Sequence, residues 1–183
     1  MLALDGARQP AYERIRTMDR GMRSTSGDDS HGLIRVMVAC KREGVMDRLR
    51  AGLSDAADFL VLGPPEIPAT ALLGSVKIYR PDVLLLDQNV LGIMGERAVE
   101  QLVELPSHPR VLLLCDKPQP RVAGTVLKCR FYGYIGSGEE IGALAYAVRC
   151  VFRGELCVPR LALAEALYGP SRPRTTSKER PAL

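Results

Sequence analysis

Short runs of consecutive apolar residues recur along the chain and constrain its fold more than any other feature. The four strong runs are residues 33–39, 59–62, 83–86 and 111–114, and a weaker run is residues 134–135. Each is long enough for one β-strand, and apolar residues stand next to one another instead of alternating with polar ones. This pattern is typical of strands covered on both faces, as in a parallel sheet.

The segments between these runs carry apolar residues at helical spacing. Val45, Leu49 and Leu53 recur every four residues, and residues 69–76, 98–105 and 139–152 show similar periodicity. Strands that alternate with helices predict an α/β fold with a doubly wound, five-stranded parallel sheet. Pro159 permits a further helix over residues 160–167, because proline is tolerated in the first turn of a helix.

Composition and charge divide the chain into four parts. We expect a flexible N-terminal arm over residues 1–32, a folded domain over 33–156, a linker helix over 157–168 and a disordered basic tail over 169–183. Residues 168–183 hold four basic residues and one acidic residue, and so supply most of the net charge of +4. The folded part is therefore nearly neutral, which argues against a basic surface for nucleic acid.

The cysteines are odd in number and form no C-x-x-C pair. This indicates reduced thiols in a cytoplasmic protein, not a disulfide framework or a zinc site. No apolar run approaches the roughly 20 residues of a membrane span, and no signal peptide is evident. We expect no membrane association, no cofactor and no metal. The five cysteines are Cys40, Cys115, Cys129, Cys150 and Cys157.

Residues 80–87, which read RPDVLLLD, resemble the third strand of the receiver domain of bacterial response regulators. In that family the strand ends in the aspartate that accepts a phosphoryl group, so the resemblance implies this role for Asp87. Tyr134 matches the family's switch aromatic. Residues 153–155 and 159–167 are similar to the end of the receiver and to the linker helix of LuxR/NarL-type regulators. The resemblance covers about residues 33–167 and implies a flavodoxin-like receiver fold.

The other functional positions of the family are changed in this chain. Cys40 and Lys41 stand where receivers place two acidic residues, Cys115 replaces a threonine or serine, and Ser137 replaces a lysine. Receivers hold Mg²⁺ through carboxylate oxygens, whereas a thiol is a soft ligand and an ammonium repels the metal. The pattern therefore predicts a degenerate pseudo-receiver.

Two side chains next to the phosphoacceptor position invite specific expectations. Lys41 can form an ion pair with Asp87, worth roughly 4 kcal/mol at about 4 Å before desolvation is subtracted. A thiolate at Cys40 beside this lysine would have a lowered pKa. Cys40 and Cys115 could also form a redox pair or a metal site, but we interpret them as small buried groups. We interpret Asp87 as a carboxylate that no longer accepts a phosphoryl group.

The leading function is a non-enzymatic module of signal transduction and transcription regulation, within a two-component system or phosphorelay. It would contact a protein partner, a regulator or kinase, or self-associate as a dimer through residues 139–152 and the linker helix. The alternatives are a phosphorylatable response regulator that uses Asp87, and a small-ligand-binding flavodoxin-like domain. We expect no direct sequence-specific DNA binding, because a helix-turn-helix output domain needs roughly 60 further residues. The expected interface residues are Ile141, Tyr146, Phe152 and Leu163.

Overall fold

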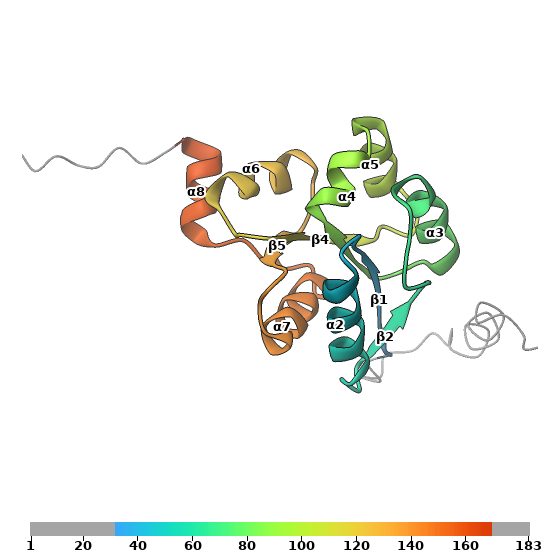
Figure 1. The fold of residues 1–183 in the computed structure, drawn as a ribbon. Coiled ribbons are helices and arrows are strands. Elements are labelled where there is room, and N and C mark those ends of the chain that lie inside the picture. Colours follow the sequence, from blue (N-terminus) through green and yellow to red (C-terminus); the bar gives the residue numbers. More distant parts are fainter. Residues whose placement is uncertain (1–31, 170–183) are drawn as a thin grey trace, which may run out of the picture. The chain divides into compact units, whose positions relative to one another are not determined.

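A computed structural model describes residues 32–169 of the chain (Figure 1). The predicted N-terminal arm and basic tail lie outside these residues, except for Gly32 and Gly169 at their inner ends.

Five strands form one sheet in which every pair of neighbours is parallel, with the order β2-β1-β3-β4-β5. This confirms the predicted fold class. Each strong apolar run became a strand, with bounds that agree to within one residue. The strands are β1 (Ile34–Ala39), β2 (Phe59–Leu62), β3 (Val83–Asp87), β4 (Arg110–Cys115) and β5 (Gly133–Gly136).

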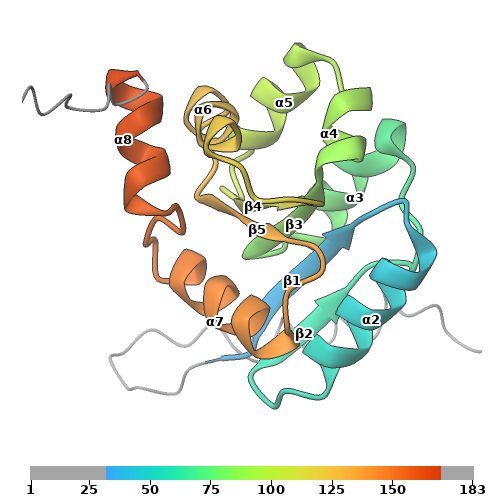
Figure 2. The same cartoon turned by 60° about the vertical axis from the view of Figure 1, so that its left-hand side comes forward.

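Helices cover both faces of the sheet, as Figures 1 and 2 show. Two helices pack on one face, and four pack on the other together with a short 3-10 turn at Ala69–Ala71. The last helix, α8 (Arg160–Tyr168), lies beside α6 (Pro120–Lys128) in both views. The first face carries α2 (Glu43–Ser54) and α7 (Ile141–Phe152); the second carries α3 (Leu72–Tyr79), α4 (Gln88–Ile93), α5 (Glu96–Val103) and α6 (Pro120–Lys128), with α8 (Arg160–Tyr168) beyond them.

Successive residues of each central strand enter opposite layers of the core. In β1, Met37 lies in the cluster under α3 to α6, whereas Val36 and Val38 lie in the cluster under α2 and α7. In β3, Leu86 and Leu85 divide in the same way. Side chains alternate across a strand, so a sheet covered on both faces needs apolar residues at every position. This is the physical origin of the continuous apolar runs.

The structure adds two helices to those predicted from periodicity. α6 was missed because its apolar positions, Val122, Ala123 and Val126, are interrupted by polar residues; it begins with Pro120 in its first turn. α4 is a single short segment that follows β3 without a loop. The helix predicted after Pro159 is confirmed as α8, with Pro159 at its N-cap. Among residues 32–169, no helix is long and apolar enough to cross a bilayer.

Candidate functional site

The candidate site lies at the carboxyl ends of β1 and β3, which are neighbours in the sheet. Ala39 of β1 pairs with Leu86 of β3, so the next residues, Cys40 and Asp87, leave the sheet side by side. The chain order reverses between these two strands, because β2 lies outside β1 and β4 lies outside β3. Doubly wound sheets gather their functional side chains at this reversal point.

Asp87 is fully buried, and both of its carboxylate oxygens accept hydrogen bonds. The Asn89 backbone N–H donates to Oδ1 at 2.7 Å, which caps the start of α4. Oδ2 accepts from the Cys40 Sγ at 3.3 Å and from Arg42 Nη2 at 2.5 Å. A buried carboxylate needs such partners, because an uncompensated charge away from water is strongly unfavourable.

Arg42 places one guanidinium between two carboxylates. Nη2 pairs with Asp87 at 2.5 Å, and Nη1 pairs with Asp116, which follows β4. Burial works to lower the pKa of Arg42, but the hydrogen bond to Asp87 and the attraction of both carboxylates outweigh it, so the pKa is raised. The group is therefore a permanent cation at this edge of the sheet. Within residues 32–169, the buried Nε of Arg42 has no hydrogen-bond partner.

The predicted ion pair between Lys41 and Asp87 is wrong. Lys41 is exposed, and the ion pairs of the described domain join Asp87 to Arg42 instead. Side-chain direction explains the difference. Cys40 contacts Asp87, Lys41 lies at a bend with its side chain exposed, and Arg42, after the bend, contacts Asp87. Arg42 is still extended, with φ −91° and ψ 103°, before α2 begins.

The thiols of Cys40 and Cys115 are both buried. Burial and the nearby negative charge of Asp87 raise the pKa of Cys40, in contrast to the lowered pKa that a thiolate beside Lys41 would have. Burial and the charge of Asp116 likewise raise the pKa of Cys115. The Cys115 Sγ donates to the Ile135 carbonyl at 3.4 Å. In this environment both groups are neutral thiols at physiological pH.

Ser137 lies at the same edge, beyond β5. Its backbone N–H donates to the Cys115 carbonyl at 2.7 Å, and its hydroxyl donates to Asp116 Oδ1 at 3.4 Å. Arg48 of α2 donates to the carbonyls of Ser137 and Glu139, the latter at 2.9 Å. The loop after β5 is thus held by hydrogen bonds from two sides.

The structure places Cys40, Cys115 and Ser137 at the same edge of the sheet as Asp87, and leaves Lys41 outside the site. Sequence reasoning missed Arg42 and Asp116. A signal was present, because both are charged residues that follow closely on a predicted strand. Their pairing could not be read from the sequence, since it depends on which way each loop turns.

The donor set at this edge does not fit a hard divalent cation. Mg²⁺ needs several oxygen ligands, and the two oxygens of Asp87 already accept hydrogen bonds from a backbone amide, a thiol and a guanidinium. Within residues 32–169, no group of three or more His, Cys, Asp or Glu side chains is placed to hold a metal ion.

The remaining predicted residues lie away from this edge. Tyr134 on β5 is buried in the core, and burial raises its pKa. Tyr146 on α7 is 65% exposed. Ile141 and Phe152 of the same helix are half-buried and pack against the core. Leu163 on α8 is also half-buried. Among the expected interface residues, Tyr146 is therefore the one that stands open to solvent.

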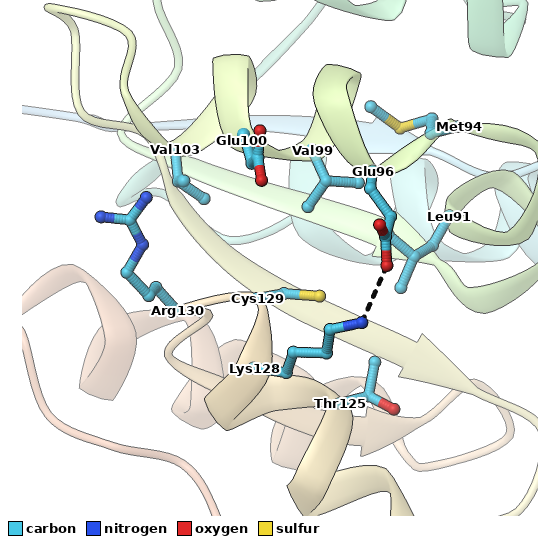
Figure 3. Close-up of a pocket in the computed structure, with 10 residues that line it drawn as sticks. All are labelled: Leu91, Met94, Glu96, Val99, Glu100, Val103, Thr125, Lys128, Cys129 and Arg130. Carbon is cyan, nitrogen blue, oxygen red and sulfur yellow. Dashed lines mark hydrogen bonds and ion pairs between the residues drawn. The ribbon is translucent and has the colours of Figure 1, made fainter.

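A separate groove of about 500 Å³ runs between α5 and α6 (Figure 3). The ion pair between Lys128 Nζ and Glu96 Oε1, 2.8 Å long, spans it. No strand contributes to the walls, and none of the residues around Asp87 lines them. The lining residues are Leu91, Met94, Glu96, Val99, Glu100, Val103, Thr125, Lys128, Cys129 and Arg130.

Comparisons with known proteins agree with this architecture. The response regulator GacA of Pseudomonas protegens is 26% identical over 150 residues, which cover 79% of this chain and 68% of GacA. The isolated receiver domain of RcsB from Salmonella enterica superposes with a TM-score of 0.61 at 19% identity and covers 73% of this chain and 98% of its own. The receiver domain of the response regulator NarL from Mycobacterium tuberculosis superposes with a TM-score of 0.60 at 25% identity. The match covers 68% of this chain and 99% of the NarL domain.

The fold is that of receiver domains, and the sequence is similar to response regulators, among them GacA and the receiver domain of NarL. The chain spans between 63% and 68% of the length of the GacA proteins that it matches. No protein-family model matches the sequence.

Proposed function

We propose that this domain is an atypical receiver that signals by protein–protein contact, without conventional phosphorylation of Asp87, in two-component or transcriptional regulation. The observation that carries the proposal is the guanidinium of Arg42, which bridges Asp87 and Asp116. A fixed cation stands next to the carboxylate that would have to react.

Phosphoryl transfer to an aspartate brings anions together and depends on positioning and on charge neutralisation by a metal ion. Asp87 offers no unengaged oxygen, because Oδ1 holds the Asn89 amide and Oδ2 holds Cys40 and Arg42. Arginine stays protonated at all physiological pH values, and its guanidinium offers only N–H donors. It therefore cannot take the place of a metal ion that bonds directly to carboxylate and phosphoryl oxygens. Ser137 also lacks the charge that would neutralise a product phosphate.

The same ion pairs connect three segments of the site. Arg42 stands just before α2, Asp87 ends β3, and Asp116 begins the loop that leads to α6. A network of this kind favours one arrangement of the loops. We infer that the domain presents a constant surface to its partner, a regulator, a kinase or a second copy, in place of a surface that changes with phosphorylation.

Intact-mass measurement after incubation with acetyl phosphate and Mg²⁺ tests the proposal. We expect no phosphate adduct on the wild-type chain. The matched control is Asp87→Asn, which removes the Asp87 carboxylate without changing the size of the side chain. An adduct on the wild type that is absent from Asp87→Asn would instead establish the alternative, a phosphorylatable regulator.

A second arm asks why the adduct is missing. We expect a variant with Cys40→Asp, Arg42→Ala and Ser137→Lys to gain both Mg²⁺ binding and an adduct, because Cys40→Asp adds an oxygen ligand beside Asp87 and Arg42→Ala removes the competing cation. The same variant with Arg42 kept should gain much less. Equal gains in the two variants would show that Arg42 does not compete with the metal.

A further inference from the structure

The groove between α5 and α6 has an apolar lining that the site around Asp87 does not use. Met94 and Val99 are buried, and Leu91, Val103 and Cys129 are half-buried, so all five pack against the core and leave part of the groove wall apolar (Figure 3). The volume of about 500 Å³ lies in the range of protein binding sites, which are commonly clefts with apolar walls and a few polar groups.

The two rims of the groove carry opposite charge. Glu96, Glu100 and Glu104 stand at four-residue spacing along α5 and its C-cap, and all three are exposed. The facing rim holds Lys128, in the last turn of α6, and Arg130, just after that helix. One rim is therefore acidic and the other is basic.

The ion pairs that join the rims are exposed to solvent. Lys128 Nζ lies 2.8 Å from Glu96 Oε1, and Arg130 Nη2 lies 3.2 Å from Glu104 Oε1. All four side chains are at least 65% exposed, and pairs of this kind add little to stability. Each charge can therefore exchange its present partner for one on another protein at small cost.

The walls of the groove are held by packing and not by these ion pairs. α5 buries Val99 and Leu102 in the core, and α6 buries Val122, Ala123 and Val126. On its other flank α6 packs extensively against α8, which lies beside it in Figures 1 and 2. The groove is thus formed before any partner binds, which lowers the cost of binding.

A helix fits this groove better than an extended peptide does. No strand contributes to the walls, so an extended peptide would find no sheet edge with which to pair. A helix that lies between two helices places its apolar ridge in the groove. Carboxylates four residues apart on α5 are about 6 Å apart along the helix axis, which matches basic residues one turn apart on a second helix.

We propose that the groove binds one amphipathic helix of a partner protein. Its apolar ridge contacts the groove lining, basic residues on one flank face α5, and acidic residues on the other flank face Lys128 and Arg130. This binding mode rests on the function proposed above, since it gives the surface and the chemistry of the protein contact. No residue that contacts Asp87 lines the groove, so a phosphate adduct on Asp87 would refute that function without changing the groove.

Selection from a displayed library of helical peptides, each about 18 residues or five turns long, gives the first test. Every peptide has a leucine ridge at helical spacing, and Lys, Glu and Ser vary freely on both flanks. We expect the full-length chain to enrich peptides with Lys on one flank and Glu on the other. These should bind at least about tenfold more tightly than peptides that carry one sign on both flanks. No enrichment, or enrichment without this charge pattern, would refute the proposal.

Reversal of one rim charge tests the pairing directly. In Lys128→Glu the groove is acidic on both sides at this point, so the enriched peptides should lose about tenfold in affinity and a peptide with Lys on both flanks should gain. The matched control is Lys77→Glu on α3, the same charge change at an exposed residue outside the groove. Equal behaviour of the two variants would show that the rim charges do not select the partner.

The position of the bound peptide is tested by filling the groove. Thr125 lines it and is exposed, so Thr125→Trp should block the peptide while urea denaturation shows an intact fold. Tyr146→Glu, on α7 at the other face of the sheet, should leave binding unchanged. Binding that survives Thr125→Trp, or that Tyr146→Glu abolishes, would place the peptide elsewhere. A wild-type dimer that Lys128→Glu and Thr125→Trp both dissociate would make a second copy the occupant, and would overturn the proposal.

Discussion

At the scale of single residues, the main feature of the site is that Arg42 forms ion pairs with both Asp87 and Asp116. The carboxylate is fully buried and the Arg42 side chain is 31% exposed, so the pair is screened only in part. Asp116, the other partner of Arg42, has a side chain that is 66% exposed. The two ion pairs of one guanidinium should therefore contribute very unequally to stability.

We expect Arg42→Ala to lower the free energy of unfolding by about 2–4 kcal/mol, because it leaves the Asp87 carboxylate buried without its cation. Asp116→Asn should cost at most about 1 kcal/mol, as is usual for exposed pairs. Urea denaturation measures both. When Arg42→Ala is made in an Asp87→Asn protein, it should lower the free energy of unfolding much less, because the buried Asp87 carboxylate is no longer there. An undiminished loss in that background would show that Arg42 acts through packing and not through the ion pair.

At the scale of elements, α2 and α7 approach each other closely over one face of the sheet. A Cβ on Gly52 of α2 would lie 2.6–2.8 Å from the side-chain carbons of Ile141, the first residue of α7. Ile141, which we expected at an interface, is therefore used inside the domain, where it packs against α2. Gly52 allows this contact because it presents no side chain.

Two glycines of α2 offer a matched comparison. Gly52→Ala should destabilise the domain by about 1–2 kcal/mol, because overpacking against Ile141 outweighs the better helix propensity of alanine. Gly44→Ala, near the start of the same helix, meets no neighbour within 4 Å and should be neutral or stabilising by up to about 1 kcal/mol. Thermal and urea unfolding rank the variants. A Gly52→Ala protein as stable as Gly44→Ala would mean that α7 shifts without strain.

At the scale of the whole molecule, the described domain presents apolar side chains on α7 and α8 that nothing within it covers. Tyr146 is 65%, Leu161 64% and Tyr168 87% exposed. Phe152, in contrast, is half-buried, and its carbonyl accepts a hydrogen bond from Arg110 at 2.8 Å. A substitution at Phe152 would disturb the fold, so Tyr146 is the better probe of contact between copies or with a partner.

We expect Tyr146→Glu to shift sedimentation of the protein toward the monomer, or to weaken binding of a captured partner, while the melting temperature changes little. Ile78→Glu on α3 is the control, because Ile78 is also an exposed apolar residue, at 70%, but lies on another helix. If Tyr146→Glu and Ile78→Glu behave alike, or if the wild type is a monomer at every concentration and binds nothing through α7, this surface is not the interface.

The sequence by itself determined the layered architecture and the position of Asp87. A strand buried on both faces must be apolar at every residue, and helices between such strands must show an apolar stripe, so both kinds of element are visible as local patterns. The residue at the end of each apolar run is visible too, so the sequence is enough to expect Cys40, Asp87 and Cys115 at one edge of the sheet.

Only the tertiary structure decided which cation reaches Asp87 and what pairs with the outer edge of β5. Lys41 and Arg42 are neighbours with the same charge, and the direction of the chain as it leaves β1 decides which of them contacts Asp87. Cys157, far along the chain, pairs with β5 because Gly133 presents no side chain at that point. Contacts of this kind join residues with no local pattern in common, because they arise from where the backbone turns and how closely two segments can approach.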